Sequence, residues 1–309
     1  MLTGQVIDHI RMAGSNAVNF ENKVPPEVTS ALIRSGPGTD SLLAAEISWE
    51  KVCLGLLEAE YRFRGLVLGV QEASWLGESS RRMAAEASRI SGWMHNAADE
   101  AERACNQAGA AARAYCSARD STVSLEKIRA NRSARKELAI QNIYSLGAYT
   151  SEIAELDHRY HKMWSQNTYA MEVYESSVGD AVARLRPFDD PSGSVEVVSP
   201  VDLNVVDRHS VSADPTALLQ AAGKLKQILG DLKFINATAD PVITGVRAPA
   251  ADEVSQSIAS KLNAQGMQYR SVNAKANEIS QQFVANLVVS ASKYKVTEDA
   301  NRLIILDQK

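Results

Sequence analysis

The sequence of 309 residues has few aromatic residues, few cysteines and no long uninterrupted apolar run. Aromatic residues make up only 6% of it, and its three cysteines, Cys53, Cys105 and Cys116, are not in a Cys-x-x-Cys spacing. A disulfide framework is therefore not expected, and we interpret the cysteines as small buried residues on helices. No stretch reaches the roughly 18 apolar residues that a membrane-spanning helix requires.

The chain also lacks a strong excess of charge. Its formal net charge is -4, with both signs interspersed. A nucleic-acid partner favours a basic stripe, so we expect no nucleic-acid binding. The first 18 residues have neither a basic start nor a continuous apolar segment, which excludes an ordinary secretory signal peptide and predicts a cytoplasmic protein unless another export signal is present.

Recognisable catalytic motifs are missing too. We find no Gly-x-Ser-x-Gly and no phosphate-binding glycine loop. Glu155, His158 and His161 form a Glu-x-x-His pattern, which binds metal in some helical bundles only when a second such motif faces it. No second motif is present, so we interpret these three residues as surface residues and expect no enzyme activity, catalytic residue, cofactor or metal.

The composition that is present favours helices. Apolar residues make up 45% of the chain, and alanine, glutamate, lysine and arginine are frequent between the turn signals. The periodicity predicts an all-α fold with helices at about residues 27–34, 41–73, 78–118, 125–144, 150–186, 215–239 and 250–292.

Turn signals divide the chain into two predicted domains. Residues 1–17 read as an N-terminal extension and residues 18–190 as a helical domain that Pro187 closes. Residues 191–212 lose the helical pattern and are interpreted as a linker, with a strand-like piece, that reaches roughly 25–30 Å. Residues 213–309 form a second helical domain, a two-helix hairpin.

A two-helix hairpin buries little apolar surface alone and therefore needs a partner. The helices predicted at 41–73 and 78–118 offer one, and we expect an elongated helical bundle in which the hairpin completes a four-helix bundle. Docking within one chain and a monomer are expected, with exchange of the hairpin between chains as the open alternative. On the helix at 41–73, apolar residues recur at helical spacing: Leu42, Leu43, Ile47, Val52, Leu56, Leu57, Phe63, Leu66 and Val70.

The first domain carries several short motifs in a fixed order: Pro25-Pro26-Glu27, Gly36-Pro-Gly38, Trp49, Trp75-Leu-Gly77, Met163-Trp164 and Pro187-Phe188. Together they resemble the mycobacterial PPE family, over about residues 18–190. The resemblance implies a five-helix PPE domain.

The second domain resembles the PE family over about residues 213–305. The matching text is Pro249-Ala-Ala-Asp-Glu-Val-Ser255, Tyr269, Phe283-Val284 and Tyr294-x-x-x-Glu298. The family's Pro-Glu is replaced by Pro215-Thr216. In these families a PE hairpin docks on the second and third PPE helices, which implies PE–PPE docking within this chain.

Both families are exported by type VII (ESX) secretion machinery. The resemblance implies a composite export signal made of Trp75, Gly77, Tyr294 and Glu298. We expect Trp75 to present a large apolar surface at an exposed turn, and Tyr294 and Glu298 to lie one helical turn apart. The chain would be cytoplasmic before export and then secreted or associated with the cell surface. Its later role, including interaction with the host, is left open.

The resemblance also implies an EspG-type cytosolic chaperone as a partner. Its contact would be the tip between the helices at 125–144 and 150–186, formed by Ile143, Tyr144, Leu146 and Tyr149. The alternative is that these apolar residues cap the end of the bundle. For the whole protein the alternative is an intracellular helical adaptor or scaffold that holds a partner protein.

Overall fold

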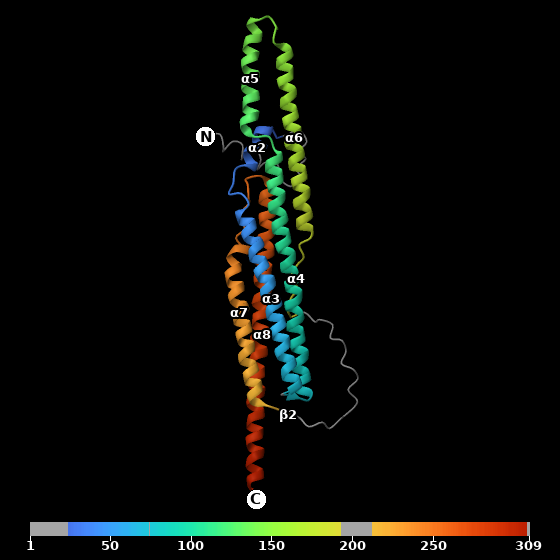
Figure 1. Cartoon of the computed structure of the whole chain (residues 1–309), viewed down its shortest axis with the longest axis vertical. Helices are drawn as coiled ribbons and strands as arrows, with labels where there is room; N and C mark the ends of the chain where they lie inside the picture. Colours follow the sequence, from blue (N-terminus) through green and yellow to red (C-terminus); the bar gives the residue numbers. More distant parts are fainter. Residues whose placement is uncertain (1–23, 74, 193–211, 308–309) are drawn as a thin grey trace, which may run out of the picture. The chain divides into compact units, whose positions relative to one another are not determined.

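The computed structural model describes residues 24–73, 75–192 and 212–307, and over them the predicted all-α fold is confirmed (Figure 1). The helices are α2 (Pro26–Ile33), α3 (Asp40–Ala73), α4 (Glu78–Ser121), α5 (Leu125–Tyr144), α6 (Thr150–Ala183), α7 (Pro215–Ile243) and α8 (Glu253–Asp307). Two short strands, β1 (Trp75–Leu76) and β2 (Ser212–Ala213), pair antiparallel. The predicted extension at 1–17 and most of the predicted linker lie outside the described residues.

Capping residues fix where the helices begin. The Ser124 hydroxyl accepts a hydrogen bond from the Lys127 amide at 3.3 Å and starts α5. The Asp214 carboxylate accepts from the amides of Thr216 and Ala217 and starts α7, with Pro215 at its first position. These starts agree with the sequence predictions.

The ends of the last two helices differ from the prediction. Helix α7 continues through Pro241 to Ile243 instead of stopping near residue 239. Arg270 on α8 stabilises this last turn, because it donates two hydrogen bonds to the Asp240 carboxylate. Helix α8 runs to Asp307 rather than to about 292, since no glycine or proline follows Gly266 in the sequence.

The described residues form two compact units. The first contains residues 24–39, 111–180 and 248–257, in which α5 and most of α6 form an antiparallel hairpin (Figure 1). Its interior holds one fully buried amide: Asn167 accepts from the Val123 amide at 2.8 Å and donates to the Pro26 carbonyl and the Ser30 hydroxyl. The Asn167 side chain on α6 thus connects this helix to α2 and to the α4–α5 connection.

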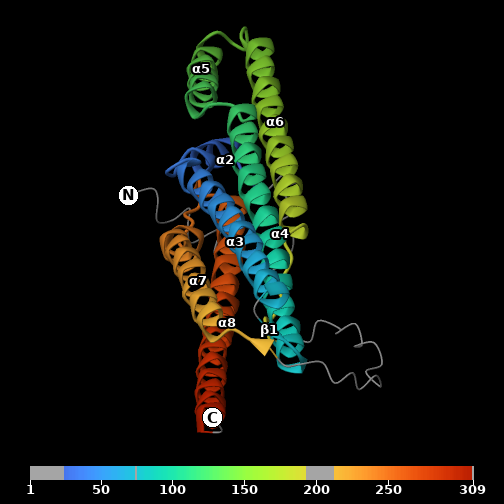
Figure 2. The ribbon, with the colours of Figure 1, turned by 60° about the horizontal axis from the view of Figure 1, so that its bottom comes forward.

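The second unit contains the described residues of 40–110, 181–247 and 258–307. Here α3, α7 and parts of α4 and α8 share one apolar core, which confirms the predicted four-helix bundle; α7 lies beside α3 in both ribbon views (Figures 1 and 2). On α4 the core contains the large residues Ile90, Trp93 and Met94 and five small ones that allow close approach of the helices: Ala87, Ala97, Ala98, Ala101 and Ala104. Each unit includes residues of both predicted domains, and the domain boundaries themselves stay a prediction.

An aromatic cluster marks the middle of the second unit. Trp49 on α3 packs against Phe188, with ring centroids 5.8 Å apart, and against Tyr269 on α8, at 5.5 Å. The Tyr269 hydroxyl donates to Asn236 Oδ1 on α7 at 2.7 Å. The packing of Trp49 against Tyr269 and the hydrogen bond from Tyr269 to Asn236 therefore connect α3, α8 and α7.

Of the apolar residues that recur at helical spacing on α3, most are buried or half-buried and three are exposed. Leu42, Val52 and Leu56 are buried, whereas Leu43, Ile47 and Leu57 are 42%, 51% and 37% exposed. The apolar residues of α3 fall on two faces, and only one face meets the bundle. Among the described residues, no helix is both long and apolar enough to cross a membrane.

Candidate functional site

Trp75 and Tyr294 meet in the second unit although 219 positions separate them in the sequence. The indole Nε1 of Trp75 donates a hydrogen bond to Tyr294 Oη at 3.2 Å. The two rings also pack edge to face, with centroids 5.9 Å apart and an interplanar angle of 77°. This geometry combines aromatic packing with a satisfied indole donor.

The expectation that Trp75 is exposed is wrong. Only 3% of the residue is accessible, and it belongs to the apolar core of its unit. Residues distant in sequence bury Trp75. It pairs with Ala213 between β1 and β2, and the Tyr294 ring lies against its indole.

Gly77 gives the chain the turn that places Trp75. Its φ is +116°, a backbone conformation that residues with a Cβ rarely adopt. Helix α4 begins at the next residue, Glu78. The glycine therefore lets the chain leave β1 and enter α4 within one residue.

Tyr294 and Glu298 lie one turn apart on α8, as predicted. Tyr294 is half-buried and Glu298 is exposed. The structure thus brings Trp75 and Tyr294 into contact, with Gly77 two residues from the indole. Among the described residues Glu298 makes no hydrogen bond or ion pair with these three.

The tip between α5 and α6 presents apolar side chains to solvent. Ile143, Tyr144 and Leu146 are 74%, 84% and 98% exposed, and Tyr149 is half-buried. This exposure argues against the alternative in which they cap the end of the bundle. The tip has a defined shape, because Asn142 Oδ1 accepts from the Tyr149 amide at 2.7 Å.

Leu146 adopts a left-handed backbone conformation at this tip. Its φ is +52°, followed by +97° at Gly147. Such a conformation costs a residue with a side chain about 1–2 kcal/mol. Leu146 has this conformation at a position where its side chain is almost fully exposed.

The Pro25-Pro26-Glu27 motif anchors the start of the first unit. Pro25 is extended and Pro26 begins α2. The Glu27 carboxylate accepts from Tyr160 Oη at 3.0 Å and lies 3.8 Å from Arg132. Burial, together with the bond to Glu27, raises the pKa of Tyr160 to about 12.

Sequence reasoning did not identify these partners of the motif, Tyr160, Arg132 and Asn167. The three come from α5 and α6, far from the motif in sequence, and no spacing rule connects them to it. The Pro-Pro-Glu motif is structural here, since its described contacts all hold α2 in place.

The Glu-x-x-His residues are on the surface of α6. Glu155 pairs with Arg159 at 2.6 Å, and His161 Nδ1 lies 2.7 Å from the Asp157 carbonyl. Within the ranges that the structure describes, no group of three or more histidine, cysteine, aspartate or glutamate residues is placed to hold a metal ion. The three cysteines are half-buried rather than buried.

The sequence matches the models of two protein families. The model of the PPE family matches residues 22–186, which is more than half of the sequence. The chain belongs to the PPE family. A model of the PE family matches residues 211–301, so a PE segment follows the PPE segment in the same chain.

The PE helices pack on the PPE helices within this chain. Helices α7 and α8 of the PE segment share the core of the second unit with α3 and α4 of the PPE segment. The docking that the family resemblance implied is therefore present, and the Trp75–Tyr294 contact is part of it.

Curated relatives come from Mycobacterium tuberculosis. The chain is 39% identical to the uncharacterized PPE family protein PPE33 over 167 residues, covering 54% of this chain and 35% of the relative. It is 34% identical to PPE14 over 228 residues, covering 72% and 52%. PPE19 is also 34% identical, over 215 residues that cover 66% and 54%. The chain thus spans only about a third to a half of these relatives' length.

Proposed function

We propose that this PPE–PE chain is a non-enzymatic substrate of a type VII (ESX) secretion system. An EspG-type chaperone would bind it in the cytoplasm, and the secretion machinery would export it to the cell surface or the medium. The contact between Trp75 and Tyr294 supports the proposal, because the family resemblance assigns one of these residues to each half of a composite export signal.

The contact makes the signal dependent on folding. Trp75 and Gly77 belong to the PPE segment, and Tyr294 and Glu298 belong to the PE segment. When the PE hairpin is not docked, the two pairs of residues are apart. A receptor that recognises both pairs together would therefore accept only the folded protein. The exposed Glu298 carboxylate, one turn beyond Tyr294, is the group most accessible to such a receptor.

The exposed tip supports the chaperone part of the proposal. Three large apolar side chains at the end of one helical hairpin would make an aggregation-prone patch if nothing covered them. A cytosolic chaperone that binds Ile143, Tyr144 and Leu146 would protect this patch until export.

Export from a type VII-competent host tests the proposal. We expect wild type in the culture filtrate or surface fraction, and Glu298→Gln and Tyr294→Ala retained in the cell pellet. Glu278→Gln, also on α8, is a matched control that should be exported. Retention of wild type while a known substrate is exported would instead favour the intracellular adaptor.

A further inference from the structure

Helix α3 carries apolar residues on the face turned away from its bundle. Its buried residues recur in a heptad pattern, at Leu42, Trp49, Leu56, Phe63 and Val70 with others between them. On the outward side, at a seven-residue spacing, lie four large apolar residues with exposures of 51%, 59%, 69% and 49%: Ile47, Leu54, Tyr61 and Leu68. The outward position of a surface helix is ordinarily polar.

Two further residues complete an outer stripe. Leu43 and Leu57 are 42% and 37% exposed and lie next to the outward four. We define the outer stripe as Leu43, Ile47, Leu54, Leu57, Tyr61 and Leu68. Its six residues fall on a and d positions of a coiled-coil seam, in which Glu50 and Arg64 occupy the two d positions between them, and the stripe runs about 38 Å along α3.

We propose that the outer stripe of α3 pairs antiparallel with the same stripe of a second copy of this chain. A two-fold antiparallel pairing centred between Leu54 and Leu57 places these two residues opposite each other across the interface. The same register places Leu43 opposite Leu68 at each end. Four apolar contacts then form, while Ile47 lies opposite Arg64 and Tyr61 opposite Glu50 of the other copy.

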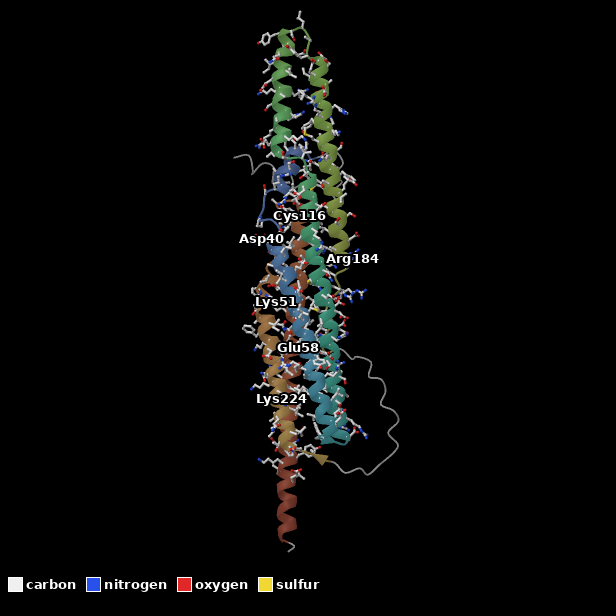
Figure 3. The ribbon with its side chains drawn as sticks, viewed as in Figure 1. Asp40, Lys51, Glu58, Cys116, Arg184 and Lys224 are labelled. Atoms are coloured by element: carbon white, nitrogen blue, oxygen red, sulfur yellow. The ribbon has the colours of Figure 1, made fainter. Side chains whose placement is uncertain are left out.

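Charges beside the stripe select this arrangement. Lys51 and Glu58 are both exposed and lie two turns apart along one edge of the stripe (Figure 3). In the antiparallel register each Lys51 faces Glu58 of the other copy, so two reciprocal ion pairs form. A parallel, in-register pairing puts the two copies of this edge on opposite sides of the seam and forms neither pair.

The surface beside the Tyr61–Leu68 end of the stripe is open. A groove of about 790 Å³ lies between α3 and α7, lined by Tyr61, Gly65, Leu68 and Lys224 among others. No atom lies within 4 Å of the place where a Cβ would stand on Gly65. A partner helix can therefore approach α3 closely on this side.

This pairing is separate from the docking of the PE hairpin. The monomer expected from the sequence followed from docking within one chain, which the structure contains. Association through α3 leaves that docking intact and adds a second interface, so neither hairpin exchange nor the proposed export is required for it.

Sedimentation velocity of the full chain over a dilution series tests the pairing. Wild type should approach twice the mass of the 33.5 kDa chain with increasing concentration. Leu54→Glu, at the centre of the stripe, should stay a monomer, while the matched control Phe234→Glu, 75% exposed on α7, should dimerise like wild type. Unchanged helical circular dichroism would establish that both variants fold.

Charge exchange distinguishes this register from any other association. Lys51→Glu and Glu58→Lys should each weaken the dimer about tenfold, because each variant puts like charges opposite. An equimolar mixture of the two variants should form a heterodimer, and the double variant K51E/E58K should recover wild-type affinity. A wild type that stays monomeric at every concentration, or single variants that dimerise like wild type, would overturn the proposal.

Discussion

Trp75 donates its indole hydrogen to Tyr294 Oη at 3.2 Å, and the two residues belong to segments that match different families. Trp75 is almost fully buried by this contact and by the pairing of β1 with β2. Two motifs that are weak as separate patterns are thus in contact in the folded chain. The proposed export signal is a property of the folded chain.

The Tyr294 hydroxyl should contribute to stability as well as to the signal. Tyr294→Phe leaves the indole donor of Trp75 without its partner, so the free energy of unfolding should fall by about 1 kcal/mol. Chemical denaturation measures the difference. Tyr169→Phe, at a tyrosine on α6 that is 68% exposed, is the matched control and should change little. Equal effects of the two changes would contradict a stabilising role of the Trp75–Tyr294 hydrogen bond.

Tyr269 should matter more, because its hydroxyl is buried. Tyr269→Phe keeps the ring against Trp49 and Phe188 but leaves Asn236 Oδ1 without its donor. We expect a loss of about 1–3 kcal/mol in denaturant unfolding. A loss below that of Tyr294→Phe would show that this network does not hold the hairpin.

Asp252 should make stability depend on pH. Its carboxylate accepts hydrogen bonds from the Ser255 amide at 2.9 Å and the Ser255 hydroxyl at 2.6 Å, while burial raises its pKa above the ordinary 3.8. The folded state therefore binds the proton more tightly, and its stability falls as pH rises from about 3.8 through the folded pKa.

Asp252→Asn keeps the side-chain cap of α8 without the charge. The stability of the Asn variant relative to wild type should therefore increase as pH rises through the same window. Denaturation at several pH values measures this difference. Asp252→Ala removes the cap and should cost about 1 kcal/mol at every pH. A constant difference between the Asn variant and wild type would contradict the buried-charge argument.

Leu146 should show a conflict between stability and chaperone binding. Leu146→Gly relieves the positive φ and should raise the free energy of unfolding of the tip by up to about 1 kcal/mol. The same change removes the most exposed side chain of the tip and should weaken binding to an EspG-type chaperone at least tenfold. Calorimetric titration measures the affinity; unchanged binding would exclude Leu146 from the contact.

The local features of the fold were predictable because they depend on neighbouring residues. Asp214 followed by Pro215 sets the start of α7, and Gly77 sets the turn before α4, in agreement with the sequence reading. The surroundings of Trp75 were not predictable by spacing, because the residue that covers it lies 219 positions away. Family resemblance, not periodicity, pointed to that pair.

The two faces of α3 show a different limit. Ile47 and Val52 both fit a helical period, yet only Val52 is buried. Periodicity identifies apolar stripes but does not say which stripe meets the bundle when a helix carries two. The buried amide of Asn167 was missed for a related reason, because its partners lie in two segments far from it in sequence, α2 and the α4–α5 connection.

The most direct test of the account compares export of Trp75→Phe and Trp93→Phe from a type VII-competent host. Both indoles are buried in the second unit and each donates one hydrogen bond, Trp93 to the Asp189 carbonyl at 3.0 Å, so the two changes remove similar groups. Only Trp75 contacts Tyr294. If the Trp75–Tyr294 contact is part of the export signal, Trp93→Phe is exported and Trp75→Phe, equally folded, stays in the cell. Equal export of both variants would contradict a composite signal.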